Sequence, residues 1–349
     1  MRIFLIAVLG LYLGASSCAL QQQRDSDTPA AVRPVADLQP VTGLPLRGVG
    51  MQIQRVDWID RYKQSIDEVA DLGADTVKIV VDARQEDGTS NRIYLDMRMT
   101  PAPNQLAEVI RHAKDRGLRV ILMPIVLLDQ PKNNEWRGTI EPQSWDAWFD
   151  SYREMLLHFA SIGAGTGADV FVVGSELISA QSHEDQWRRT IADVRKVFPG
   201  ALTYSSNWDR YTAVPFWDAL DLIGMNSYWK LGEGPDASVE EIVGRWKAIQ
   251  GELLPWVRST GKPLLLTEVG WHTRNNAAYE PWDYTTDDPI DPALQARLYE
   301  GFFQAWDGVD ELGGYSIWEW PPGDGGPTDS GYTPEGKPAE DVLRREWSQ

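Results

Sequence analysis

The octapeptide VFVVGSEL, Val170 to Leu177, carries a glutamate at the end of an apolar run. Val170 to Val173 follow one another without a polar residue, which is typical of a strand buried on both faces, as in a parallel sheet. Glu176 stands where that strand ends. The segment LLLTEVGW, Leu264 to Trp271, repeats the arrangement with Glu268. Two carboxylates in matching positions after buried strands call for one common explanation.

Outward from these two segments, short apolar runs alternate with longer stretches whose apolar residues recur at helical spacing. Glycines stand shortly before the second, third and seventh of these runs, at Gly73, Gly117 and Gly261, where a helix has to end and the chain turn back. The alternation predicts eight strands, at Arg47 to Ile53, Thr76 to Val81, Arg119 to Val126, Asp169 to Gly174, Leu202 to Ser206, Leu222 to Asn226, Leu264 to Thr267 and Gly314 to Trp318.

Eight strand and helix repeats over about 300 residues predict an α/β fold, a (β/α)8 TIM barrel, for residues 44–349. A doubly wound sheet fits less well, because no glycine-rich phosphate loop follows the first strand. Active sites of such barrels lie at the C-terminal ends of the strands. Glu176 follows the fourth predicted strand and Glu268 ends the seventh, so we expect both at one mouth of the barrel.

A pair of carboxylates across one cleft is what glycoside hydrolysis requires. One carboxyl group protonates the departing oxygen, and the other attacks the sugar carbon in a retaining mechanism. A single glutamate at a strand end is more often a partner in an ion pair. The repeated context of Glu176 and Glu268 favours the catalytic interpretation.

The chain resembles a glycoside hydrolase of clan A, and within it family 113, known for retaining β-mannanases. Besides the segments VVGSEL and LLLTEVGW, the resemblance rests on TYSSNWD after the fifth strand, DLIGMNSYW at the sixth and GGYSIWEW at the eighth. It implies that Glu176 is the acid/base and Glu268 the nucleophile. It also implies that Tyr228 donates a hydrogen bond to the nucleophile and that Trp318 forms the floor beneath the attacked sugar.

One position departs from the pattern of the clan. Many members have an asparagine directly before the acid/base, where this sequence has Ser175. Either Ser175 or Asn207 is therefore expected to meet the sugar 2-hydroxyl group, and Asn226 is a further candidate for substrate binding.

The tryptophans divide by position. Trp145, Trp148, Trp187 and Trp246 fall at helical spacing and are predicted in the core. Aromatic rings in a cleft can stack on the apolar faces of sugars. Because they follow strand ends, we expect such a role for Trp208, Trp229, Trp271, Trp318 and Trp320, and Trp136 in the loop PKNNEWRGTIEPQ is placed to extend the cleft.

Other kinds of site find less support in the sequence. Asp82 and Glu319 also lie near strand ends, but neither has a partner in matching context. The histidines lack the spacing of an HExxH zinc site, and VGSEL is not a GxSxG elbow, so we expect neither a metal nor a cofactor. Lys78, on the second strand, is expected to point into the barrel mouth or to form a buried ion pair.

The N-terminus predicts export. Met1 and Arg2 precede an apolar stretch from Ile3 to Gly14 and small residues, as in an export signal spanning residues 1–18. The sequence ASSC resembles a bacterial lipobox, in which Cys18 is lipidated; a cleaved signal without lipid is the alternative. Residues 19–43 are rich in Gln, Ala, Asp and Pro and are predicted to be a flexible linker. We expect a protein of the bacterial periplasm or cell surface that meets a membrane only through this anchor.

The net charge of the chain indicates which classes of partner it can bind. A formal net charge of −18 and a pI near 4.6 disfavour nucleic acid. We expect a monomer acting on an oligo- or polysaccharide, most simply a β-1,4-linked mannan or glucomannan. Other β-glycans such as glucan, xylan or an exopolysaccharide, a transglycosylase with the same glutamates, and a non-catalytic sugar-binding lipoprotein are the alternatives.

Overall fold

The computed structural model describes residues 39, 41–323 and 325–348. The predicted export signal, Cys18 and nearly all of the predicted linker at residues 19–43 lie outside the described part. The described residues belong to one compact unit by their contacts. No helix in the described ranges has the length and apolar character needed to cross a membrane.

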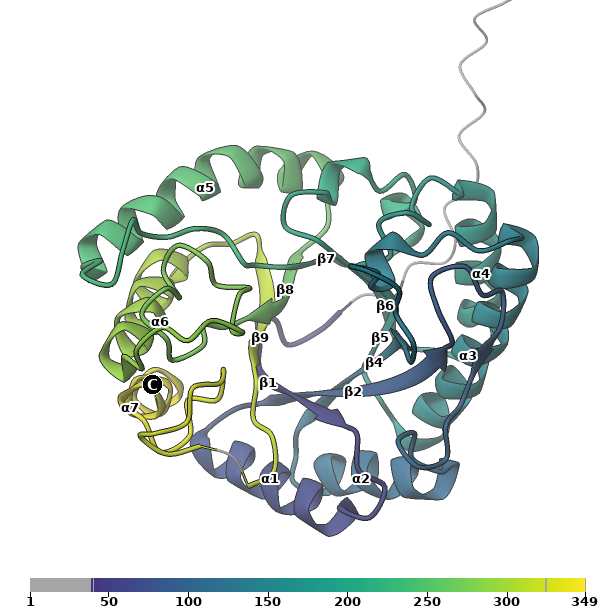
Figure 1. The fold of residues 1–349 in the computed structure, drawn as a ribbon, viewed down its shortest axis with the longest axis horizontal. Helices are drawn as coiled ribbons and strands as arrows, with labels where there is room; N and C mark the ends of the chain where they lie inside the picture. The colour runs from purple at the N-terminus through teal and green to yellow at the C-terminus, as the bar shows by residue number, and fades with distance from the viewer. Residues whose placement is uncertain (1–38, 40, 324, 349) are drawn as a thin grey trace, which may run out of the picture. The chain divides into compact units, whose positions relative to one another are not determined.

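Eight parallel strands close into a barrel, which confirms the predicted (β/α)8 fold (Figure 1). The strand order runs from β1 through β9, β8, β7, β6, β5 and β4 to β2, and pairing of β1 with β2 closes the ring. All eight predicted strands are present, with small differences at their ends. Their bounds are β1 Leu46–Ile53, β2 Thr76–Gln85, β4 Arg119–Leu128, β5 Val170–Ser175, β6 Ala201–Ser206, β7 Ile223–Asn226, β8 Leu264–Val269 and β9 Leu312–Trp318.

A ninth, two-residue strand was not predicted. β3 (Ile93–Tyr94) pairs antiparallel with the extended end of β2, where Arg84 lies opposite Tyr94. Two residues are too few to produce a recognisable apolar period.

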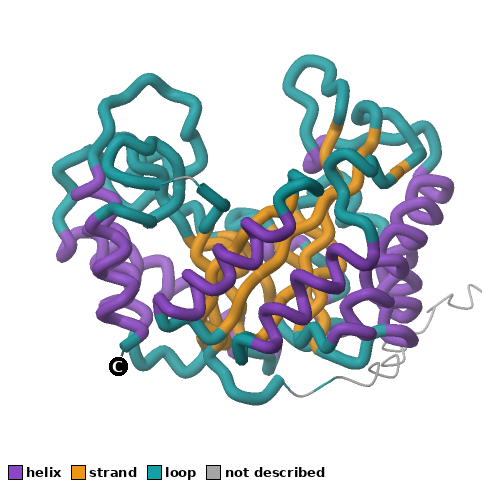
Figure 2. Tube along the Cα trace, turned by 90° about the horizontal axis from the view of Figure 1, so that it is seen from below, coloured by secondary structure: helices purple, strands orange, loops and turns teal. Residues whose placement is uncertain are grey.

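The helices surround the barrel as an outer layer (Figure 2). Between β6 and β7 the connection has no α-helix and contains the 3₁₀ turns η2 (Tyr211–Ala213) and η3 (Trp217–Ala219), and η1 (Arg137–Thr139) lies in the loop after β4. The α-helices are α1 Ile59–Leu72, α2 Pro103–Asp115, α3 Trp145–Thr166, α4 Glu184–Val197, α5 Val239–Thr260, α6 Pro292–Trp306 and α7 Pro338–Trp347.

Local chemistry explains where these helices end. Gly73 and Gly261 take left-handed φ values of 102° and 67° directly after α1 and α5, a conformation that costs other residues more. Ser144 and Ser238 cap α3 and α5 by accepting backbone N–H groups. The chain therefore returns to the barrel at the places the glycine pattern predicted.

The apolar core has two layers. A smaller cluster that includes Val80, Met123, Val172 and Leu265 fills the inside of the barrel, and a larger one packs the outer faces of the strands against the helices. Such a barrel is a packed core and not a pore, so its functional surface lies at the strand ends.

Candidate active site

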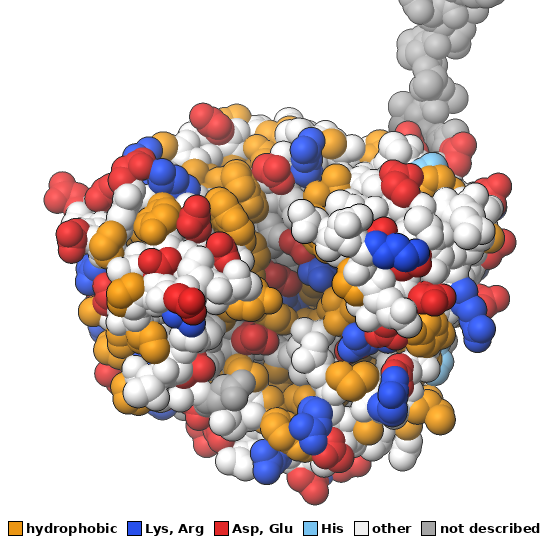
Figure 3. Space-filling model, viewed as in Figure 1, with side chains coloured by type: hydrophobic (Ala, Val, Ile, Leu, Met, Phe, Trp, Pro, Cys, Tyr) orange, Lys and Arg blue, Asp and Glu red, His pale blue; other side chains and the backbone are white. Residues whose placement is uncertain are grey.

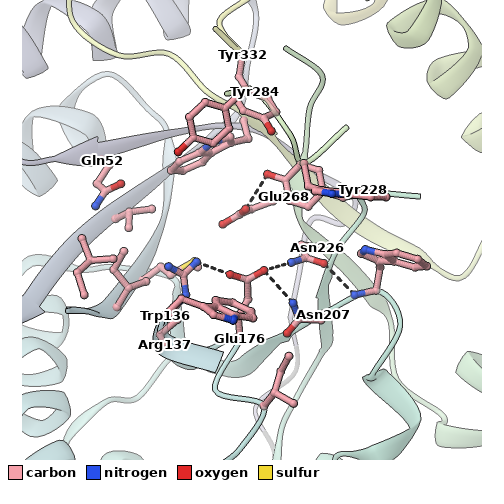
Figure 4. Close-up of a pocket in the computed structure, with 18 of the residues that line it drawn as sticks. Gln52, Trp136, Arg137, Glu176, Asn207, Asn226, Tyr228, Glu268, Tyr284 and Tyr332 are labelled. Atoms are coloured by element: carbon pink, nitrogen blue, oxygen red, sulfur yellow. Dashed lines mark hydrogen bonds and ion pairs between the residues drawn. The ribbon is translucent and has the colours of Figure 1, made fainter. Parts of the chain in front are cut away.

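A cavity of about 770 Å³ lies over the C-terminal ends of the barrel strands. It appears as a hollow in the face shown in Figure 3, with charged side chains of both signs on its floor. Glu176 and Glu268, the two glutamates singled out in the sequence, both line it (Figure 4). The other lining residues are Gln52, Gln54, Val80, Met123, Ile125, Leu127, Trp136, Arg137, Ile178, Asn207, Trp208, Asp209, Asn226, Tyr228, Trp282, Tyr284, Trp318 and Tyr332.

Glu176 reaches the cavity because of an unusual backbone conformation. β5 ends at Ser175, and Glu176 has a φ of 55°, which non-glycine residues rarely adopt. Its backbone N–H donates to the carbonyl oxygen of Ser205 at 2.9 Å, so the residue stays attached to β6. Strain of this kind is concentrated at functional sites, and here it directs a carboxyl group over the barrel mouth.

The carboxylate of Glu176 accepts hydrogen bonds on both oxygens. Asn207 Nδ2 donates to Oε1 at 3.2 Å, and Asn226 Nδ2 donates to the same oxygen (Figure 4). Arg137 Nη2 forms an ion pair with Oε2. Burial raises the pKa of Glu176, while the nearby guanidinium of Arg137 lowers it in part and the negative charge of Glu268 raises it further.

Glu268 lies in a different environment. It belongs to β8 and is only 7% exposed. The Tyr228 hydroxyl donates to Glu268 Oε2 at 2.9 Å, and Lys78 Nζ lies 3.4 Å from Oε1. A cation therefore lies at one carboxyl oxygen of Glu268 and a phenol donor at the other.

Lys78 is a buried cation beneath the site. Its Nζ donates to the carbonyl oxygen of Thr267 at 2.8 Å and lies 4.7 Å from the centre of the Trp318 ring. Burial lowers the pKa of Lys78, and Glu268 acts in the opposite direction. Of the two expectations for Lys78, the buried ion pair is confirmed, and the side chain lies beneath the cavity without lining it.

Aromatic side chains line the walls of the cavity. Trp208 and Trp282 lie nearly parallel, with ring centres 6.4 Å apart and an angle of 21° between the planes. Trp282 and Tyr284, both in the loop after β8, are 50% and 58% exposed. Faces of this kind suit the C–H groups of sugar rings. Trp136 and Trp318 line the same cavity, as the sequence predicted.

Three other tryptophans that follow strand ends do not line the cavity. Trp271 is fully buried and packs edge-on against Tyr299 of α6, with ring centres 5.0 Å apart. Trp320 is buried as well and donates to Glu68 Oε2 at 3.1 Å. Trp229 is half-buried behind Trp208, at 5.8 Å between ring centres, and does not reach the cavity. Trp229, Trp271 and Trp320 therefore do not line the cavity in which they were expected, because residues beyond a strand end need not face the mouth. Trp148, Trp187 and Trp246 are buried core residues, as predicted.

The structure separates the two candidates for the 2-hydroxyl contact. Ser175 is buried and does not line the cavity. Asn207 lines the cavity, and its Oδ1 has no hydrogen-bond partner among the described residues. Of the two candidates, Asn207 lines the cavity and Ser175 does not.

The rival carboxylates lie outside the cavity lining. Asp82 is fully buried and pairs with Arg84 Nε at 2.6 Å, and burial raises its pKa. Glu319 is not a lining residue either. In the described ranges, no group of three or more His, Cys, Asp or Glu side chains is arranged to hold a metal ion.

Several lining residues were missed by the sequence analysis. Arg137 directly follows Trp136, which was predicted to extend the cleft, so its position next to that tryptophan indicated a cavity residue. Trp282, Tyr284 and Tyr332 come from the long loops after β8 and β9. Gln52 lies on β1, Val80 on β2, and Met123, Ile125 and Leu127 on β4. For these residues the sequence pattern shows only that they belong to strands.

Solved structures of similar fold include three mannanases. A family 113 β-mannanase from Alicyclobacillus acidocaldarius, solved in complex with ManMIm, is 31% identical with a TM-score of 0.80, covering 88% of this chain and 98% of that one. A family 113 β-1,4-mannanase is 27% identical with a TM-score of 0.80, covering 88% and 100%. A complex structure of a family 113 β-1,4-mannanase is 26% identical with a TM-score of 0.79, covering 87% and 98%.

More distant structures share the fold alone. A β-glucuronidase from Ruminococcus gnavus is 14% identical with a TM-score of 0.59, and covers 87% of this chain but 50% of its own. A comparison with curated protein sequences gave no match. The model of Glycoside Hydrolase Family 113 matches residues 49–337, which span all eight barrel strands except the first residues of β1. The chain therefore belongs to Glycoside Hydrolase Family 113, a family of clan A.

Proposed function

We propose that this glycoside hydrolase cleaves β-1,4-linked polysaccharide, most simply mannan or glucomannan, with retention, through a covalent intermediate on Glu268. One observation carries the proposal. Two glutamates from the ends of different strands share one cavity but differ in surroundings: burial raises the pKa of Glu176, whereas Glu268 faces a lysine and a phenol donor. Carboxyl groups whose environments differ in this way are suited to separate acid and nucleophile roles.

In the first step, the Glu268 carboxylate attacks the anomeric carbon and forms a C–O bond. The glycosidic C–O bond breaks, and the Glu176 carboxyl group gives its proton to the departing oxygen. Lys78 and Tyr228 hold Glu268 in position through hydrogen bonds to its two oxygens.

In the second step, Glu176 is a carboxylate and takes a proton from water. That water attacks the anomeric carbon, the bond to Glu268 breaks, and the sugar leaves with its original anomeric configuration. Glu176 is protonated again at the end of the cycle, so protons and charges balance.

The choice of sugar rests on the cavity and on the family. The aromatic side chains at Trp136, Trp208, Trp282 and Trp318 suit a chain of sugar rings, and the strongly acidic surface suits an uncharged one. The three similar family 113 structures are mannanases by description. Specificity against glucan or xylan depends on contacts to the 2-hydroxyl group, and we propose Asn207 for this contact.

The test is the release of reducing ends by residues 44–349 on mannan, glucomannan, xylan and mixed-linkage glucan. Mannan or glucomannan is expected to give the highest kcat/KM. A higher value on xylan or glucan would overturn the substrate assignment while leaving the mechanism in place. Retention of polysaccharide in an affinity gel without any release would favour the sugar-binding interpretation, and elongated products would favour a transglycosylase.

We also propose export and lipid anchoring through Cys18, which rest on the sequence of residues 1–18. Growth with labelled palmitate is expected to label the full-length protein and not its Cys18→Ala variant. Equal labelling of the two, or none in either, would contradict the anchor. As a partner we propose a polysaccharide alone, bound by a monomer.

A further inference from the structure

Arg137 contacts the proposed acid/base from a loop outside the barrel strands. It begins η1 in the connection between β4 and α3, directly after Trp136. Its Nη2 donates to Glu176 Oε2, and the two side chains are only 18% and 13% exposed. Trp136, Arg137 and Glu176 all line the cavity (Figure 4). The pair lies where a sugar approaching the proton donor would have to bind.

Every hydrogen bond that the described residues make with the Glu176 carboxyl group comes from a donor. Asn207 and Asn226 donate to Oε1, and Arg137, which cannot be deprotonated, donates to Oε2. Donors on both oxygens favour a carboxylate without a proton. Proton transfer to a glycosidic oxygen instead requires a proton on one of these oxygens. The donors use both lone-pair positions of Oε1 and one of Oε2, so a proton would have to share Oε2 with the Arg137 guanidinium. Withdrawal of this cation would therefore favour protonation of Glu176.

Arg137 is the contact best able to change. Asn226 is the last residue of β7, and its Oδ1 also accepts the backbone N–H of Trp208 at 2.9 Å, so its amide is held at both ends. Asn207 has a short side chain directly after β6. Arg137 has a long side chain on a loop, and its buried Nε has no hydrogen-bond partner in the described part of the chain. A guanidinium with unused donors can bind sugar hydroxyl groups.

We propose that Arg137 is a substrate-operated counterion of Glu176. In the free enzyme it holds Glu176 as an ion pair. When the leaving-group part of the polysaccharide binds, Arg137 transfers its hydrogen bonds to hydroxyl groups of that sugar, and Glu176 takes up one proton from solvent. This rests on the proposed acid/base role of Glu176. After the proton passes to the departing oxygen, Glu176 is again a carboxylate that Arg137 can pair with as the product leaves.

The other charged and titratable groups facing Glu176 stay in place during this exchange. Lys78 of β2 and Glu268 of β8 act on its charge with opposite signs, and both lie on barrel strands. Burial raises the pKa of Tyr204 in β6 and that of Tyr228 after β7, so both hydroxyls remain neutral. Arg137 is therefore the charge beside Glu176 that a substrate can move.

The proposal predicts that the pH profiles of kcat/KM and kcat differ. The basic limb of kcat/KM reports Glu176 in the free enzyme, and that of kcat reports Glu176 with substrate bound. In the wild-type enzyme, acting on soluble oligosaccharides of its polysaccharide, we expect the kcat limb to lie about one to three pH units above the kcat/KM limb. In Arg137→Met the kcat/KM limb is expected to rise until the two coincide. Arg137→Lys should keep part of the separation.

A matched control comes from the same loop. Lys132 pairs with Asp87 at 2.5 Å and does not line the cavity, so Lys132→Met is expected to leave both limbs where they are. Coinciding limbs in the wild-type enzyme, or an unmoved kcat/KM limb in active Arg137→Met, would overturn the proposal. A wild-type protein that cleaves no glycan would overturn the proposed function as well, which is a different result.

A second measurement needs no Arg137 variant. Glu268→Ala is expected to bind substrate without turnover, so calorimetry in buffers of different ionisation enthalpy can count protons taken up on binding. We expect uptake approaching one proton for an oligosaccharide that spans the cleavage point, at pH values just above the kcat/KM limb of the wild-type enzyme. Binding without uptake across the accessible pH range would overturn the counterion role.

Discussion

Glu268→Ala is expected to lower kcat on polysaccharide by on the order of 10⁴-fold or more, because it removes the group that forms the covalent intermediate. Neighbouring residues cannot replace it, since Lys78 and Tyr228 are arranged as donors to its oxygens and not as nucleophiles. The release of reducing ends, measured at the pH optimum of the wild-type enzyme, checks this. Glu240→Gln, an exposed change on α5, is the matched control and is expected to keep full activity.

Folding has to be separated from chemistry in that experiment. The Lys78 ammonium has two acceptors, the Thr267 carbonyl oxygen and the Glu268 carboxylate. Removing Glu268 leaves only the carbonyl oxygen, and a buried charge without a counterion is destabilising. Glu268→Gln keeps an acceptor for Lys78 and is the second variant to test. A Glu268→Gln protein with a wild-type melting temperature and more than a tenth of the wild-type kcat would falsify the nucleophile assignment.

Glu176→Ala is expected to lower activity on unactivated polysaccharide by about 10²- to 10⁴-fold, the contribution of a general acid. The loss should be much smaller on aryl glycosides whose leaving group departs without protonation. The basic limb of the kcat/KM profile is expected to disappear, since burial raises the pKa of Glu176 and activity is lost as pH rises through it. Steady-state kinetics on both substrate types over pH checks these points.

Azide offers a sharper form of this experiment. In Glu176→Ala the space left by the carboxyl group admits a small anion, which can attack the covalent intermediate without general base help. We expect azide to restore turnover of an aryl glycoside and to yield a glycosyl azide of the β configuration. A product of the α configuration, or equal losses on activated and unactivated substrates, would contradict the roles given to the two glutamates.

A position after a strand end places some tryptophans in the cavity and others in the core. Trp208 and Trp318 line the cavity as predicted, while Trp271, three residues after Glu268, does not. Gly270 lies so close to β9 that a Cβ there would come 2.2 Å from the carbonyl oxygen of Trp318. The chain leaves β8 along this close contact and turns the Trp271 ring toward α6. Alternation fixes side-chain direction within a strand but not after it.

The residues that contact Glu176 could also be predicted from the sequence only in part. Asn207, Asn226 and Glu176 come from three neighbouring strands, so their approach at one mouth followed once the barrel was predicted. Arg137 lies 39 positions before Glu176, in a loop whose path no local pattern describes. That loop is held by its own contacts, in which Glu135 accepts the backbone N–H of Gly88 at 3.0 Å and that of Lys132 at 2.9 Å. These contacts exist only in the folded chain.

By itself the sequence determined the barrel and the position of both glutamates at its mouth. Apolar runs, helical periods and glycine stops are local properties, and closing eight such repeats brings the strand ends together whatever the loops do. Only the tertiary structure decided that Arg137 reaches Glu176, that Lys78 lies under Glu268 and that Trp271 is buried. Those outcomes depend on loop paths and on packing between distant segments, which follow from the whole core and not from any stretch of the chain.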